Sequence, residues 1–195
     1  MDRVDCAYRF EMRYFQFHIM PNAWDHFVCA TFRLKPGTRV VAHDYNMGDW
    51  YPDEQKTLVV PEKKVGNPGI SYIFYWVVPA LVAGKWQSQI NVGGKNLDYE
   101  FDIVQFFQNI DGDASVGGMR GEMRGKMVGE QIRFSITGKN GQKLERHEFQ
   151  GQVSGDNIVG TLRIGEGSAQ RQSAWTAKRI KRGELVVAQD EPAAK

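Results

Sequence analysis

Several features that mark common protein classes are missing from this 195-residue chain. It contains no run of about 18 consecutive apolar residues, which a transmembrane helix requires. Its first residues lack the basic and apolar regions of a secretory signal peptide. Cysteine is limited to Cys6 and Cys29, and neither belongs to a C-x-x-C pair or a metal-ligand cluster. We therefore expect a reduced, cytoplasmic protein with no membrane partner and no metal site.

A strong charge of either sign is also missing. The formal net charge is +2 at pH 7, which is too small to indicate a nucleic-acid partner. Residues 118–126 alternate glycine with cations, as some RNA-binding segments do, but Glu122 interrupts them and they fall in an expected hairpin. Hydrophobic residues make up 42% of the chain and charged residues 25%, as in soluble globular proteins. The length suits one large domain or two small ones.

Glycine is absent from residues 1–30 and frequent later, since 16 of the 21 glycines lie in residues 84–167. There they separate eight strand-like runs: 85–91, 97–107, 114–120, 123–128, 131–137, 144–153, 158–164 and 172–179. Residues that favour hairpin turns stand between most of these runs, at 91–94, 111–113, 129–130, 138–141, 155–157 and 165–167. Eight short strands at this spacing predict a mainly β protein, with an antiparallel barrel or meander over residues 84–180.

An internal similarity supports the hairpins. Residues 124–132 match residues 150–158, with identical residues at Gly125 and Gly151, at Gly129 and Gly155, and at Ile132 and Ile158. Two copies do not establish a repeat architecture. Two successive hairpins of one meander explain the match more simply.

The first 80 residues show a weaker pattern. Alternation near residues 10–14 favours a short strand, and the turn at Pro36-Gly37 precedes an apolar strand, 39–42, expected to be buried on both faces as in a parallel sheet. Residues 51–69 read as a loop with a short strand at 58–60. The run 70–78 has the strongest β-propensity in the chain. No helix is predicted, and residues 181–195 are expected to form a disordered tail.

The glycine-rich stretch opens with Gly84-Lys85-Trp86. A Gly-x-Trp on the first strand of a meander resembles the signature of lipocalin-type (calycin) barrels. The resemblance implies that the Trp plugs the closed end and that a basic residue of the last strand, here Arg179 or Lys178, packs over its indole. It also implies a small apolar ligand inside the barrel as a candidate partner. The apolar residues of the second strand are expected to be packing residues rather than ligand contacts: Phe101, Ile103, Phe106 and Phe107.

A second resemblance covers roughly residues 32–180. The segments Leu34–Val41, His43–Asp53 and Trp76–Ala80 are similar to a bacterial group of class I SAM-dependent methyltransferases. In that family the first segment is a late strand of the Rossmann-like domain, and a glycine-rich β-module follows in several members. The resemblance implies that residues 1–80 contain, from about residue 32, a short remnant of a Rossmann-like α/β domain.

The chain departs from this family where the cofactor binds. Class I methyltransferases hold SAM through a glycine-rich loop after the first strand and an acidic residue that ends the second. Residues 1–30 contain no glycine, and neither feature can be placed there. We therefore expect no cofactor bound by this chain and no methyl transfer by it alone, although SAM is implied for the full-length family. The missing SAM-binding features are consistent with a truncated gene product and equally with a natural remnant that carries the barrel.

Three residues, His43, Asp44 and Asp49, are the weak catalytic candidates. At the carboxyl end of a parallel strand, a His beside carboxylates could deprotonate a methyl acceptor. The alternative is a turn held by Asp and Asn side chains, which the sequence favours because a base without SAM has nothing to catalyse. Trp50 and Trp76 are expected in the core.

Three hypotheses for function follow. The chain is the C-terminal part of a methyltransferase that is incompetent alone, a β-barrel that binds a small apolar ligand, or a β-domain that pairs with another chain. The last rests on residues 70–78, since an exposed strand there would recruit a second strand and allow self-association.

Overall fold

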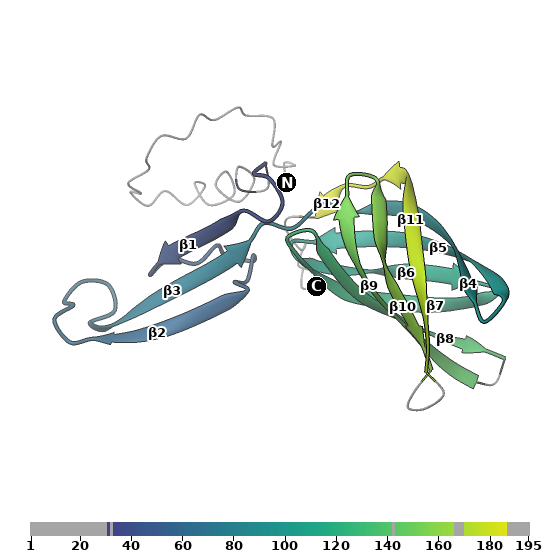
Figure 1. The fold of residues 1–195 in the computed structure, drawn as a ribbon. Helices are drawn as coiled ribbons and strands as arrows, with labels where there is room; N and C mark the ends of the chain where they lie inside the picture. The colour runs from purple at the N-terminus through teal and green to yellow at the C-terminus, as the bar shows by residue number, and fades with distance from the viewer. Residues whose placement is uncertain (1–30, 32, 142, 166–169, 187–195) are drawn as a thin grey trace, which may run out of the picture. The chain divides into compact units, whose positions relative to one another are not determined.

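The computed structural model describes residues 31, 33–141, 143–165 and 170–186 of the chain. They belong to two compact units, residues 1–78 and 79–195 (Figure 1). This boundary lies close to the one expected from the sequence, between residue 80 and Gly84. The strand expected near residues 10–14 and both cysteines lie outside the described residues.

The first unit contains a three-stranded antiparallel sheet. Its strands are β1 (Arg39–His43), β2 (Glu54–Val60) and β3 (Gly69–Val77), in the order β1-β3-β2. Because β1 and β2 both run antiparallel to β3, they run parallel to each other. The run with the strongest β-propensity is therefore the central strand, and its edges are paired on both sides. The edges that could take another strand belong to β1 and β2.

The prediction that residues 39–42 are buried on both faces is wrong. β1 alternates between exposed and half-buried residues, and Val41 is 64% exposed. The strand lies at an edge, pairs antiparallel with β3, and no second layer of described residues covers its Val41 face. The neighbouring β2 is longer than the expected strand at 58–60, since it begins at Glu54.

Two tryptophans form the centre of this unit, as predicted. Trp50 and Trp76 are fully buried, with their ring centroids 6.3 Å apart. The Trp76 Nε1–H donates to the Trp50 carbonyl oxygen at 2.9 Å, which satisfies the buried indole. Met47 is buried with them.

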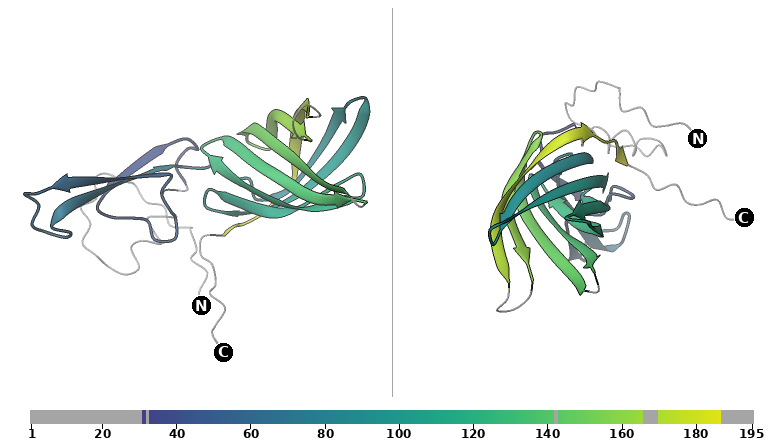
Figure 2. Two further views of the ribbon diagram at one scale, coloured as in Figure 1. Left: turned by 90° about the horizontal axis from the view of Figure 1, so that it is seen from below. Right: turned by 90° about the vertical axis from the view of Figure 1, so that its right-hand side faces the viewer.

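The second unit is an antiparallel eight-stranded closed barrel (Figure 2), as the glycine spacing predicted. Its strands are β4 (Gly84–Val92), β5 (Lys95–Phe106), β6 (Asn109–Val116), β7 (Met119–Val128), β8 (Gln131–Asn140), β9 (Lys143–Ser154), β10 (Asn157–Ile164) and β11 (Arg171–Arg182). Each pairs with the next along the chain, and β11 closes the barrel against β4. Alternate residues face the interior, as the pleat requires.

One expected turn is wrong. Residues 111–113 lie within β6, and the chain instead turns at Phe107-Gln108 and at Gly117-Gly118, so β6 and β7 begin earlier than predicted. Gly112 serves a close approach between strands: a Cβ there would lie 2.0 Å from the Asp102 carbonyl oxygen. The glycine therefore reflects backbone crowding within the barrel wall, a demand that sequence alone does not separate from a turn.

The two similar segments form the β7–β8 and β9–β10 hairpins, as predicted. Their turn glycines, Gly129 and Gly155, have φ values of 58° and 59°. Such left-handed backbone strongly favours glycine.

The chain continues in regular structure past residue 181, where a disordered tail was expected. β11 extends to Arg182, and β12 (Leu185–Val186) pairs parallel with β5. Residues 187–195 lie outside the described residues. Within the described part of the chain, no helix is long and apolar enough to cross a membrane.

Candidate functional site

One end of the barrel is closed by the three residues of the barrel signature. The Arg179 guanidinium carbon lies 4.5 Å from the ring centroid of Trp86, which is fully buried. Gly84, beside them, has a φ of 121°, and a Cβ there would lie 2.1 Å from the Lys181 carbonyl oxygen. The structure thus brings Gly84, Trp86 and Arg179 together, while Lys178 is exposed.

Arg179 fastens the surrounding loops to this end. Its guanidinium donates to the carbonyl oxygens of Leu81, Ala83 and Gly155, and its Nε lies 3.1 Å from an Asp156 carboxylate oxygen. Burial lowers the pKa of Arg179 from its ordinary value, and Arg182 lowers it further, while Asp156 opposes both. The side chain is 4% exposed, so these contacts compensate a largely desolvated charge.

A buried glutamine completes the closure. Gln105, with no exposed surface, accepts a hydrogen bond from the Val82 N–H and donates to the carbonyl oxygens of Ala80 and Phe107. These hydrogen bonds satisfy backbone groups of the 79–83 segment, namely the Val82 N–H and the Ala80 carbonyl oxygen, at the closed end of the barrel. This residue was not singled out from the sequence, although it interrupts the apolar inward positions Phe101, Ile103 and Phe107.

An aromatic cluster fills the middle of the barrel. Phe134 and Phe149 stack with centroids 4.6 Å apart, and Phe101 and Trp175 meet them edge-on at 4.9–5.8 Å. All four are at most 5% exposed. Of the residues predicted for packing, Phe101, Ile103 and Phe107 are buried, and Phe106 is half-buried. The middle of the barrel is therefore occupied by its own side chains.

The opposite end is open. A cavity of about 930 Å³ lies at this mouth of the barrel. Its lining is mainly apolar at Val92, Leu97, Val116, Met119, Leu144 and Ile164, with His147, Glu145 and Thr137 among the polar residues. The cations Lys95, Arg146 and Arg171 also line it.

A second opening lies in the barrel wall. The ladder between β4 and β11 pairs residues 84–87 with 178–182 only, so residues 88–92 and 171–177 face each other without pairing. We call this gap the seam. A cavity of about 610 Å³ lies along it, lined by the inward residues Ser88, Tyr99, Ile158 and Ala177 together with outward ones.

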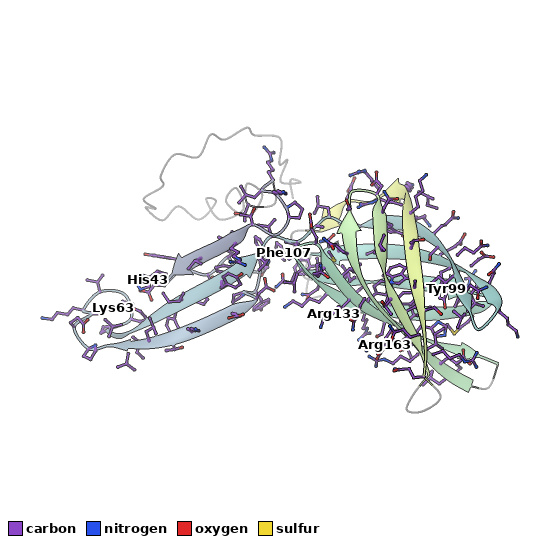
Figure 3. All side chains as sticks on the ribbon, viewed as in Figure 1. His43, Lys63, Tyr99, Phe107, Arg133 and Arg163 are labelled. Atoms are coloured by element: carbon purple, nitrogen blue, oxygen red, sulfur yellow. The ribbon has the colours of Figure 1, made fainter. Side chains whose placement is uncertain are left out.

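Tyr99 and His147 connect the seam with the mouth. The Tyr99 hydroxyl lies 3.0 Å from the His147 Nδ1, and the His147 Nε2 lies 3.7 Å from a Glu145 carboxylate oxygen. Burial raises the pKa of the Tyr99 hydroxyl, and Glu145 adds to the rise. Burial lowers the pKa of His147, with Glu145 opposing. Figure 3 labels Tyr99 within the barrel.

The catalytic candidates His43, Asp44 and Asp49 lie in the other unit (Figure 3 labels His43 and Lys63). The Asp44 carboxylate accepts from the Tyr72 N–H at 2.8 Å and from the Lys63 ammonium, which also donates to the Ile70 carbonyl oxygen. The Lys63 hydrogen bond, with the Tyr72 N–H, lowers the pKa of Asp44.

These contacts show that Asp44 and Lys63 stabilise the turn that follows β1. Asp44 has a φ of 63°, a conformation that Asp tolerates better than most residues. His43 Nε2 lies 3.5 Å from the Asp44 carboxylate, and Asp49 is exposed. The structure brings His43 and Asp44 together, but among the described residues the Asp49 side chain forms no hydrogen bond or ion pair with them. The arrangement supports the turn interpretation over a general base.

The polar residues at the mouth and seam, Ser88, Tyr99 and His147, were missed in the sequence. Each occupies an inward position in a strand whose neighbouring inward positions are largely apolar, and that break in alternation was the available signal. In the described residues, no group of three His, Cys, Asp or Glu side chains is placed to hold a metal ion. Comparisons of the chain with protein-family models, curated proteins and solved structures found no match.

Proposed function

We propose that the barrel binds one small, mainly apolar ligand in its open half, as a lipocalin-like binding module. The observation that carries the proposal is the cavity of about 930 Å³ at the mouth, which lies within the usual range for small-molecule sites, roughly 300–1,000 Å³. Eight-stranded barrels are wide enough to be filled by side chains or to hold one small ligand. Here the aromatic cluster fills the middle of the barrel, and the mouth beyond it is left for a ligand.

The lining suits such a ligand. Apolar side chains on six of the strands surround the mouth, and the aromatic cluster lies deeper in the barrel. Burying an apolar ligand there gains roughly 25 cal/mol for each Å² removed from water. The seam offers a second route for exchange, since its backbone edges are not tied together.

Fluorescence titration with the apolar probe 1-aminoanthracene tests the proposal. We expect saturable one-to-one binding with a micromolar dissociation constant. Leu97→Trp places a bulky ring in the mouth and should abolish binding. Leu81→Trp makes the same change at an exposed position of the closed end and should leave binding unchanged. Absence of saturable binding, or equal binding by both variants, would contradict the proposal.

We also propose that residues 32–80 are the closing part of a class I methyltransferase-like domain, and that the 195 residues alone do not bind SAM. The supporting observation is the sheet order: the parallel strands β1 and β2 flank the antiparallel β3. Doubly wound sheets commonly carry such an antiparallel strand near one edge. Calorimetry with SAM tests this, since micromolar binding would overturn it.

A further inference from the structure

Two cations lie beside one turn at the rim of the mouth cavity. Lys95 begins β5 and Arg171 begins β11, and both line this cavity. Lys95 is paired directly with Val92 across the β4–β5 turn. A Cβ at Gly93, inside the same turn, would lie 3.3 Å from the Arg171 Nη1, so the guanidinium lies against the turn. The two charged groups therefore flank a single turn at the mouth.

The phase of the strands directs both side chains to the mouth. Lys95 stands four residues before Tyr99 on β5, and Arg171 stands four residues before Trp175 on β11. Tyr99 and Trp175 are buried inside the barrel. Because alternate residues of a strand share a face, Lys95 and Arg171 lie on the inner face of the wall, at the end that opens to solvent. Their charges face the mouth and not the outer surface.

Neither cation has a carboxylate partner in the described part of the chain. The third lining cation, Arg146, has its Nε 3.1 Å from a carboxylate oxygen of Glu148. Glu145 is the one carboxylate among the described lining residues, and it faces the His147 Nε2 on β9 at 3.7 Å. Lys95 and Arg171 form no ion pair with any described residue, so an anion at their turn would neutralise charge that the chain leaves uncompensated.

The position of these charges decides where the head of a ligand lies. The wall beneath them is apolar at Leu97, Met119 and Ile164. A ligand with an apolar chain and an anionic head would bury its chain against this wall and keep its head at the rim, where water still reaches it, so the cost of desolvating the charge is small. A guanidinium matches the two oxygens of a carboxylate, whereas a neutral head gains less and a cationic head is repelled.

We propose that the mouth selects amphipathic molecules with a carboxylate head and one apolar chain. Arg171 and Lys95 hold the head at the β4–β5 turn, and the chain enters the cavity. This inference rests on the proposed ligand-binding function. It adds a class of ligand and the direction in which the ligand lies.

Displacement of bound 1-aminoanthracene at pH 7.5 tests the proposal with three eight-carbon competitors: octanoate, 1-octanol and octylamine. Their heads are anionic, neutral and cationic at this pH. We expect octanoate to displace the probe at about fivefold lower concentration than 1-octanol, and octylamine to require the highest concentration. Raising NaCl from about 50 mM to about 500 mM should reduce the preference for octanoate about threefold, because the rim is open to salt.

Variants of the two cations test which residues hold the head. Arg171→Gln should lower the ratio of octanoate affinity to 1-octanol affinity about fivefold, and Lys95→Gln about threefold. Arg171→Lys keeps the charge and should keep most of the ratio. Because the ratio compares two ligands in one variant, it cancels changes in the apolar cavity.

Arg163→Gln is the matched control, because it removes the same charge near the mouth from an outward position of β10 (Figure 3 labels Arg163). It should leave the ratio unchanged. Octanoate binding no more tightly than 1-octanol, octylamine binding most tightly, or an unchanged ratio in Arg171→Gln would overturn the inference and leave the ligand-binding function in place. Failure of 1-aminoanthracene to bind the unmodified protein would overturn the ligand-binding function itself.

Discussion

The guanidinium of Arg179 lies over the indole of Trp86, 4.5 Å from its ring centroid, at the closed end of the barrel. The two residues stand on β11 and β4 and are directly paired in register, so the contact joins the last barrel strand to the first. Three carbonyl oxygens from the 79–83 segment and the β9–β10 turn accept hydrogen bonds from the same guanidinium.

Removing this arginine should destabilise the barrel. Arg179→Ala loses the cation–π contact and leaves three carbonyl groups without their donor, so we expect the free energy of unfolding to fall by about 3 kcal/mol. Arg179→Lys keeps the charge but not the forked geometry and should lose an intermediate amount. Chemical denaturation measures both. Lys178→Ala, next along β11 and exposed, is the control, and an equal loss there would refute the role given to Arg179.

Gly160 is required because the neighbouring strand passes too close for a side chain, not because of turn geometry. A Cβ at Gly160 would lie 1.9 Å from the Gln150 carbonyl oxygen, so Gly160→Ala must push strands β9 and β10 apart. We expect a loss of about 3 kcal/mol or more in the free energy of unfolding. Gly117, at an open turn with a φ of 54°, has no atom within 4 Å of a Cβ. Gly117→Asn should cost less than about 1 kcal/mol, because Asn accepts this conformation.

Stability should depend on pH through His147. Burial lowers its pKa below the ordinary value of 6.5, so near and below that value the unfolded chain binds more protons than the folded chain. The free energy of unfolding should be highest above about pH 7 and fall as the pH drops through 6.5 toward the pKa of the folded state. Urea denaturation at pH 7.5 and 5.5 measures this difference.

His147→Gln should reduce the difference between the two pH values. The matched variant His43→Gln, at an exposed position in the other unit, should keep it. A pH dependence that is the same in all three proteins would show that His147 is not the responsible group.

The seam should be visible in amide hydrogen exchange. Residues 88–92 of β4 and 171–177 of β11 each pair with a strand on one side only. In contrast, β8 and β9 pair with a strand on both sides over most of their length. We expect alternate amides along both seam segments to exchange rapidly, because their N–H groups point across the gap. Uniform protection of both segments would mean that β4 and β11 are hydrogen-bonded to each other along these segments in solution, and would contradict the seam.

The barrel could be predicted from the sequence because its evidence is local. Turn residues and alternating strands recur at a regular spacing, and the two similar hairpins repeat this pattern. Gly112 misled the prediction, because a glycine needed for strand crowding and a glycine needed for a turn look alike. The burial of residues 39–42 was also misjudged, since an apolar strand does not reveal whether a second layer covers it.

The candidate site could not be predicted in the same way. Ser88 and Tyr99 are paired in one hairpin, but His147 is far from both in the chain, and its contact with Tyr99 depends on the stagger of the strands around the barrel. The seam exists because the β4–β11 ladder stops at Gln87, and no residue type at that point indicates where the pairing ends. His43 and Asp44, in contrast, are neighbours in the chain, and their role in a turn was one of the two expected readings.

The most direct test of the account is an NMR titration of the protein with 1-octanol, which reports where a ligand binds. We predict saturable shift changes at Leu97, Met119 and His147, which line the mouth, with residues around Trp86 and Arg179 at the closed end unchanged. Shift changes centred on the closed end, or no saturable change at millimolar 1-octanol, would contradict the claim that the open half of the barrel is a binding site.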